Sequence, residues 1–166
     1  GSAEQAEELL MEQAGEYDQD REFQELLYQA EGQARQQRRA AVMREAAVLL
    51  KTQKAPERAW LLLAKHGAEY GEDKEYQELW IYALSTGREY AAAWEKLLWF
   101  KRVGDTKRSK TYRDLVHTAI EALPCSDKAA VAGALKSPGA QGLLWRADAA
   151  ACTGNYVYAE THYRLA

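Results

Sequence analysis

The sequence predicts an all-α fold, and three observations support this prediction. Good helix-forming residues dominate the composition, whereas β-branched residues are scarce. Apolar residues recur at i, i+3, i+4 and i+7, as in Phe23, Leu26, Leu27 and Ala30, which is the spacing of one helix face. Glycine or proline interrupts this pattern repeatedly along the chain. We therefore expect a series of short helices.

The first half of the chain is predicted to contain five helices. Gly32 weakens or ends the second of them, so the third is expected to be separate. Pro56 suits the first position of the fourth helix, and Gly87 suits the C-cap of the fifth. The expected ranges, each bounded by a break in the periodic pattern, are 3–14, about 20–32, about 36–51, 56–71 and 75–86.

Five more helices are predicted in the second half. The eighth has Ser126 or Asp127 as its expected N-cap and ends before 137–139. The last two flank the turn at 153–155. The other expected ranges are 89–103, which ends at a Gly-Asp pair, and about 109–123, which ends before Pro124.

Small and large residues have a fixed spacing at the end of the chain. Gly154, Tyr156, Ala159, Tyr163 and Ala166 follow the order Gly-x-Tyr-x-x-Ala-x-x-x-Tyr-x-x-Ala. Small residues at one helical interval let two antiparallel helices approach closely, and the aromatic side chain fills the space above them. This order resembles the second half of a tetratricopeptide repeat. Such a helix pair needs neighbours of its own kind to bury its apolar face.

The breaks in the pattern have a matching period. Successive breaks of one kind are separated by roughly 30 to 39 residues, which brackets the 34-residue tetratricopeptide period. The resemblance implies a right-handed α-solenoid of about five antiparallel helix pairs, whereas a three-layer helical bundle or another αα-solenoid would show similar periodicity. The expected turns lie near Gly15, Lys54, Gly87, Pro124 and Gly154 within pairs and near Gly32, Gly71, Gly104 and Pro138 between pairs; the small position recurs as Ala59, Ala93, Ala129 and Ala159.

One domain is expected over 3–166, as part of a longer array, with Gly1 and Ser2 as a cloning remnant. The net charge of −3 gives little reason to expect DNA or an anionic membrane as a partner. No apolar run is long enough to cross a bilayer, so we expect no membrane contact by this segment. Exposed apolar ends of the array are expected to permit weak self-association.

The residues that carry chemistry are scattered. His66, His117 and His162 lie on different predicted helices without a second ligand one turn away, so no metal site, cofactor or enzyme activity is expected. Cys125 and Cys152 fall on the same edge of the predicted array. A disulfide between them is conceivable, but stacked repeats lie about 10 Å apart, so two free, half-buried thiols are the preferred interpretation.

Charge is distributed unevenly along the chain. The first 33 residues contain ten Asp or Glu, and Arg21 is their only cation. Basic blocks follow at 35–44 and 101–113. Nucleic acid is the less favoured explanation of these blocks, because charged helix faces are usually just solvated or pair with a neighbouring repeat.

In tetratricopeptide-like arrays the first helices of successive pairs line a concave surface, so the resemblance implies a partner-binding groove. The family's carboxylate clamp needs asparagines beside its basic residues, and Arg44 and Lys51 have none, so that activity is not expected. The residues that the resemblance places along the groove are Arg44, Lys51, Gln77, Ile81, Asp114, Thr118, Glu121, Leu144 and Asp148.

The expected function is that of a non-enzymatic scaffold that binds another protein through a concave or edge surface. The stretch 83–90, Ala-Leu-x-Thr-Gly-Arg-Glu-Tyr, is similar to the periplasmic repeat regions of bacterial exopolysaccharide-export proteins. Those regions precede an outer-membrane porin and hold polymer-modifying enzymes, which favours the periplasm over the cytoplasm.

The alternative function is a polymer-binding module, in which polysaccharide or RNA follows basic and aromatic residues. These two functions differ in whether the tryptophan rings need to be exposed. A polymer-binding module needs aromatic rings exposed in a row, whereas a scaffold can bury them between helices. The residues that decide are Trp80, Trp94, Trp99 and Trp145.

Overall fold

The computed structural model describes residues 2–17, 19–135 and 139–166, and every regular element in these ranges is a helix. The predicted all-α class is therefore confirmed for this part of the chain. The helices are α1 (Ser2–Gln13), α2 (Arg21–Lys51), α3 (Pro56–Lys65), α4 (Gly67–Tyr70), α5 (Lys74–Thr86), α6 (Tyr90–Arg102), α7 (Thr106–Glu121), α8 (Cys125–Ala134), α9 (Gly139–Cys152) and α10 (Tyr156–Leu165).

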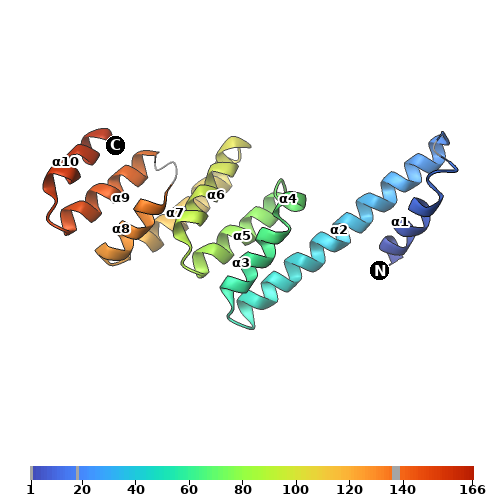
Figure 1. The fold of residues 1–166 in the computed structure, drawn as a ribbon, viewed down its shortest axis with the longest axis horizontal. Helices are drawn as coiled ribbons and strands as arrows, with labels where there is room; N and C mark the ends of the chain where they lie inside the picture. The colour runs from blue at the N-terminus through green and yellow to red at the C-terminus, as the bar shows by residue number, and fades with distance from the viewer. Residues whose placement is uncertain (1, 18, 136–138) are drawn as a thin grey trace.

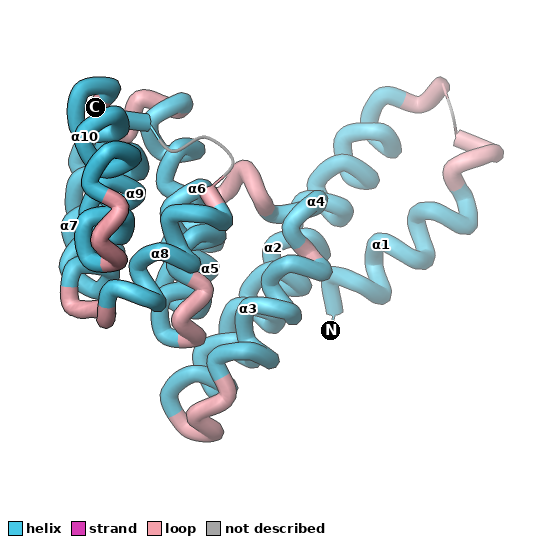
Figure 2. Tube along the Cα trace, turned by 60° about the vertical axis from the view of Figure 1, so that its left-hand side comes forward, coloured by secondary structure: helices cyan, strands magenta, loops and turns pink. Residues whose placement is uncertain are grey.

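The helices follow one another in space in the same order as in the sequence. Each packs mainly against its neighbours along the chain, so α2 contacts α3, α5 contacts α6, and α9 contacts α10. Short loops join most of them (Figure 2). The molecule is therefore elongated, and its two termini lie toward opposite ends (Figure 1). None of the described helices combines the length and apolarity needed to span a bilayer.

The first correction concerns α2, which is a single helix of 31 residues. The predicted break at Gly32 is wrong. A glycine within a helix costs only about 0.5–1 kcal/mol, which is too little to end a long helix. Ala30 and Ala34 on either side of it are buried. The expected first pair of short helices is replaced by α1 packed against the N-terminal part of α2.

The second correction is a break within the predicted helix 56–71, which the structure divides into α3 and the short α4. Gly67 begins α4 beside the indole of Trp80. A Cβ atom at this position would lie 2.7 Å from Cη2 of that ring, so the close approach requires glycine. The chain bends here to accommodate a large side chain of α5.

Side chains from α2 to α9 form one continuous apolar core, which extends from Ala46 to Trp145. The Tyr76 hydroxyl donates a hydrogen bond of 2.7 Å to the Leu63 carbonyl, so this polar atom is satisfied inside the core. The largest fully buried side chains are those of Leu63, Tyr76, Ile81, Phe100, Val116, Ile120 and Trp145.

Polar side chains cap several helices. Asp20, Asp73, Asp105 and Asn155 each accept a hydrogen bond from a backbone N–H of the first turn of α2, α5, α7 and α10. The predicted cap of α8 at Ser126 or Asp127 is wrong, because α8 begins at Cys125 after Pro124 without a side-chain cap. The predicted turn at Pro138 and the assignment of Gly1 lie outside the described residues.

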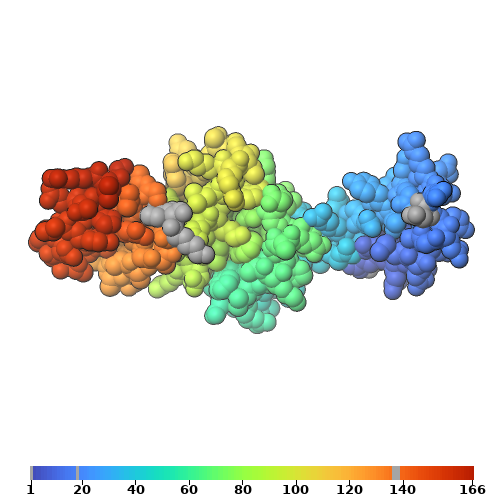
Figure 3. Space-filling model, turned by 45° about the horizontal axis from the view of Figure 1, so that its top comes forward, coloured from blue at the N-terminus to red at the C-terminus, as the bar shows by residue number. Residues whose placement is uncertain are grey.

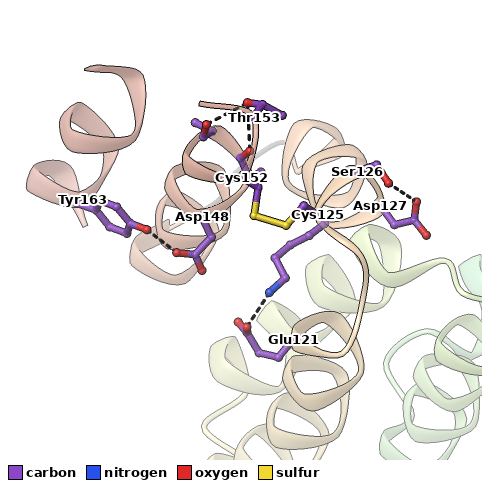
Figure 4. Close-up of a disulfide and its surroundings, with 11 residues drawn as sticks. Glu121, Cys125, Ser126, Asp127, Asp148, Cys152, Thr153 and Tyr163 are labelled. Carbon is purple, nitrogen blue, oxygen red and sulfur yellow. Dashed lines mark hydrogen bonds and ion pairs between the residues drawn. A yellow bond between two sulfur atoms is a disulfide. The ribbon is translucent and has the colours of Figure 1, made fainter. Parts of the chain in front are cut away.

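A disulfide joins Cys125 to Cys152, with their Cα atoms 6.1 Å apart (Figure 4). The preferred interpretation as free, half-buried thiols is therefore wrong, and both residues are exposed. Cys125 is the first residue of α8 and Cys152 is the last of α9. Because these adjacent helices run in opposite directions, those two ends lie together. The spacing between helix axes therefore overestimates the distance between the two cysteines.

Candidate binding groove

The residues predicted to line a groove do not form one surface. Gln77 and Ile81 are 2% and 0% exposed, so their placement on an open groove is wrong. They belong to the face of α5 that packs into the core. The Gln77 side chain donates a 2.6 Å hydrogen bond to the Gly71 carbonyl, which fixes the loop between α4 and α5.

Arg44 and Lys51 are exposed, and they lie two turns apart on α2. Asp114 and Thr118 are also exposed, but they lie on α7. Between α2 and α7 the chain places α3 to α6, so the two pairs lie on different parts of the molecule (Figure 1).

Glu121 of α7 joins three helices. It accepts hydrogen bonds from Nε1 of Trp145 on α9 at 2.7 Å and from Nζ of Lys128 on α8 at 2.9 Å. The hydrogen bond from Lys128 and that from Trp145 hold the pKa of Glu121 below its usual value against the opposing effect of burial. This residue therefore has a structural role.

Leu144 and Asp148 of α9 are half-buried. Asp148 accepts a 2.6 Å hydrogen bond from the Tyr163 hydroxyl, which raises the pKa of this tyrosine and ties α10 to α9 (Figure 4). Several predicted groove residues thus connect adjacent helices and are less available to a partner.

An open groove of about 820 Å³ lies between α6, α7 and the start of α9. Of the predicted residues, only Asp114 lines it. Trp94, Leu97 and Leu98 of α6 provide its apolar floor. The Trp94 ring is 9% exposed and packs edge-on against Trp145, with 4.7 Å between ring centroids, so the floor lies directly on the core.

Cations outnumber carboxylates around this floor. Lys101, Lys110 and Arg113 line the groove, and Asp114 is the one carboxylate among the described lining residues. Arg113 approaches Asp114 at 3.8 Å, whereas Lys101 and Lys110 have no ion-pair partner in the described ranges. Close unpaired cations create a positive potential that attracts a negatively charged ligand.

One other cation of this basic block, Arg108, is already paired. Arg108 contacts both Glu78 and Asp105, and Lys74 contacts Asp105 at 3.2 Å. These residues connect α5 to α7. The structure therefore separates the paired Arg108 from the cations that face the groove, although the sequence presents the basic block at 101–113 as uniform.

The helical spacing of the lining residues is visible in the sequence, and it indicates the groove once α6 and α7 are known to be neighbours. Trp94, Leu97, Leu98 and Lys101 follow the i, i+3, i+4, i+7 spacing of one helix face. On α7 the lining residues Thr106, Ser109, Lys110, Arg113, Asp114 and His117 follow the same spacing. The interpretation of the basic block as merely solvated missed this surface.

The tryptophans do not form an exposed row. Trp80, Trp94 and Trp99 are 8–9% exposed, and Trp145 is fully buried. The Lys96 ammonium lies 3.2 Å from the centroid of the Trp80 ring, which further covers that ring. Burial lowers the pKa of Lys96 to about 8. Stacking of sugars or bases on these rings would require the core to open.

Among the described residues no group of three or more His, Cys, Asp or Glu is placed to hold a metal ion. No protein-family model matches this sequence, and no curated protein or solved structure matches it either.

Proposed function

We propose that this protein is a helical-repeat interaction module, and that the groove between α6, α7 and α9 binds an acidic, amphipathic helical segment of a partner protein. One observation carries this proposal: an apolar floor is flanked by Lys101 and Lys110, which have no ion-pair partner among the described residues, and by Arg113. Such a site offers burial to apolar side chains and charge complementarity to carboxylates.

Each part of the groove makes a different contribution to binding. Every apolar side chain that the floor fully buries is worth about 1.5–3 kcal/mol. The cations mainly raise the association rate and select the partner, because exposed ion pairs contribute little net free energy. A helix that carries leucines on one face and glutamates beside them uses both parts, as in other helix-in-groove interactions.

We further propose a right-handed, tetratricopeptide-like arrangement for the region from the second half of α2 to α10, with the N-terminal helices in place of a fifth pair. The packing of each helix on its neighbours in the chain supports this arrangement. Ala59, Ala93 and Ala159, three of the four predicted small positions, are at most 3% exposed, while Ala129 is half-buried.

For the compartment, we propose an oxidising one such as the periplasm. The support is the disulfide between Cys125 and Cys152, since such bonds persist in oxidising compartments and are rare in the cytosol. The role in exopolysaccharide export that the 83–90 resemblance implies is compatible with this compartment. Co-purification of the protein from a periplasmic extract, with the wild type compared to K110E/R113E, would identify the client.

The groove is tested by binding of a designed helical peptide that has leucines on one face and flanking glutamates. Fluorescence anisotropy of the labelled peptide should give saturable binding that weakens with salt. The variant K110E/R113E should bind about tenfold more weakly or worse, since like charges replace opposite ones. The matched control R44E/K51E makes the same charge change on α2 and should bind like the wild type.

Equal binding by wild type and K110E/R113E would contradict the proposed site, and loss in R44E/K51E alone would favour the α2 surface. A glutamate peptide without leucines separates the two contributions, since it should bind much more weakly. Strong binding of an RNA oligonucleotide or an anionic polysaccharide, unchanged when the apolar floor is truncated in L98A, would favour the polymer-binding alternative instead.

A further inference from the structure

The N-terminal part of the molecule extends away from the core as an arm, defined here as α1 and residues 21–34 of α2. The space-filling view shows this arm joined to the rest by a narrow waist (Figure 3). α1 packs mainly against α2, and the buried apolar residues of the arm are Ala3, Ala30 and Ala34. Most of its surface is therefore available for contact.

The arm carries an excess of negative charge. Of its carboxylates, Glu7 is bound to Arg38 and Glu25 to Arg21. Glu8 and Glu12 of α1 are exposed, and neither has an ion-pair partner in the described ranges. This end of the molecule is consequently the electrostatic opposite of the groove.

One exposed face of α1 combines charge with apolar surface. Glu8 and Glu12 are neighbours at i and i+4, and Leu9 and Glu12 are neighbours at i and i+3, so the three lie on the half of α1 opposite the buried Ala3 and the paired Glu7. The Leu9 side chain is 62% exposed. This arrangement, an exposed leucine beside two glutamates on a helix, is the chemistry that the proposed groove selects.

We propose that the groove of one copy of this chain receives α1 of a second copy. This inference rests on the proposed function of the groove and names its occupant. Leu9 covers the apolar floor at Leu98, and Glu8 and Glu12 meet the cations of Lys110 and Arg113. The charges and the apolar contacts of both surfaces are thereby satisfied together.

The contact is between molecules because the arm and the groove lie far apart in one chain. α1 lies at one end of the array, while α6, α7 and α9 lie toward the other (Figure 1). A contact of this kind joins two different surfaces, so each copy keeps one free arm and one free groove. Head-to-tail association therefore continues beyond the dimer and does not close at two copies.

Two complementary variants test this geometry on the full chain. K110E/R113E has a disabled groove and an intact arm, whereas E8K/E12K has a disabled arm and an intact groove. Sedimentation velocity should show that the wild type forms dimers and longer species as concentration rises, and that added salt disperses them. Each variant alone should be monomeric. An equimolar mixture should associate again into dimers and longer species, because every arm in the mixture then finds a groove of opposite charge.

The control R44E/K51E should associate like the wild type, and circular dichroism should show that all variants retain their helices. A wild type that stays monomeric at every concentration would overturn the inference, as would association that both variants leave unchanged. The designed peptide distinguishes the two proposals. If the wild type binds this peptide but does not self-associate, the groove function stands and the second copy is not its occupant. If it does neither, both proposals fail.

Discussion

The indole N–H of Trp145 donates a 2.7 Å hydrogen bond to Oε1 of Glu121, although the Trp145 side chain is fully buried and Glu121 lies at the surface. The bond crosses from α9 to α7 and satisfies a polar group that the core would otherwise leave unpaired. The same carboxylate binds Lys128 of α8, so one side chain connects α7, α8 and α9.

Loss of this acceptor should destabilise the fold. Glu121→Ala leaves the buried Trp145 N–H without a partner, and we expect it to lower the free energy of unfolding by about 1–3 kcal/mol. Glu121→Gln retains an acceptor oxygen and should cost less than half as much. Urea unfolding measures both. Equal losses in the two variants would show that the charge, and not the hydrogen bond to Trp145, is what matters.

The same site predicts a pH dependence of stability. The pKa of Glu121 is lowered in the folded protein, chiefly by the hydrogen bond from Lys128. Its contribution is therefore complete above the unfolded-state pKa of about 4.3 and is lost as the pH falls through the lower folded-state pKa. The stability difference between wild type and Glu121→Gln should shrink as the pH is lowered from 6 to 3. A difference that stays constant over this range would contradict the prediction.

The disulfide should stabilise the C-terminal helices. It closes a loop with a sequence separation of 27 residues, for which loop-closure entropy gives about 2–4 kcal/mol. Cys125→Ser/Cys152→Ser and the reduced wild type should both have a free energy of unfolding that is lower by about this amount, and therefore a lower denaturation midpoint. Hydrogen exchange should locate the effect in α8 to α10 and leave α3 and α5 protected. Identical midpoints with and without reductant would refute this prediction.

Two glycines should respond in opposite ways to alanine. A Cβ at Gly32 meets no atom within 4 Å, so Gly32→Ala should stabilise α2 by about 0.5–1 kcal/mol. A Cβ at Gly67 would lie 2.7 Å from the Trp80 ring, so Gly67→Ala should destabilise the protein by about 1–3 kcal/mol. Thermal unfolding of both variants checks these signs. A destabilised Gly32→Ala would indicate that α2 bends at this residue in solution.

Local signals predict much of the helical organisation. The predicted helix 75–86 agrees closely with α5, because an Asp and a Gly mark its two ends. The predicted turn at 153–155 is also confirmed between α9 and α10. The error at Gly32 arises because propensity is only a weak determinant, and a single glycine is outweighed by the continuous hydrogen bonding of a long helix.

The groove was not predictable to the same degree, because it depends on which faces of α6 and α7 turn toward one another. The sequence indicates a periodic face on each helix. It does not show that Arg108 is bound to Glu78 and Asp105, or that Lys110 has no ion-pair partner among the residues that the structure describes. The placement of Gln77 and Ile81 on an open surface was wrong for a related reason. The resemblance assigns each residue a position along its helix, but it does not show which neighbouring helix covers that position.

The unbroken α2 has a mechanical consequence for the molecule. Its 31 residues form a continuous helix about 46 Å long. The length of this helix sets the distance of α1 from the core, and its rotation about the helix axis sets the direction in which α1 lies. Because a helix turns about 100° per residue, one alanine inserted near Gln36 would swing the face that bears Leu9 to a new direction without changing any residue that it presents. Seven inserted residues would return that face to within about 20° of its starting direction while carrying it about 10 Å farther out. The number of residues in α2 thus determines the direction that the acidic end of the protein faces.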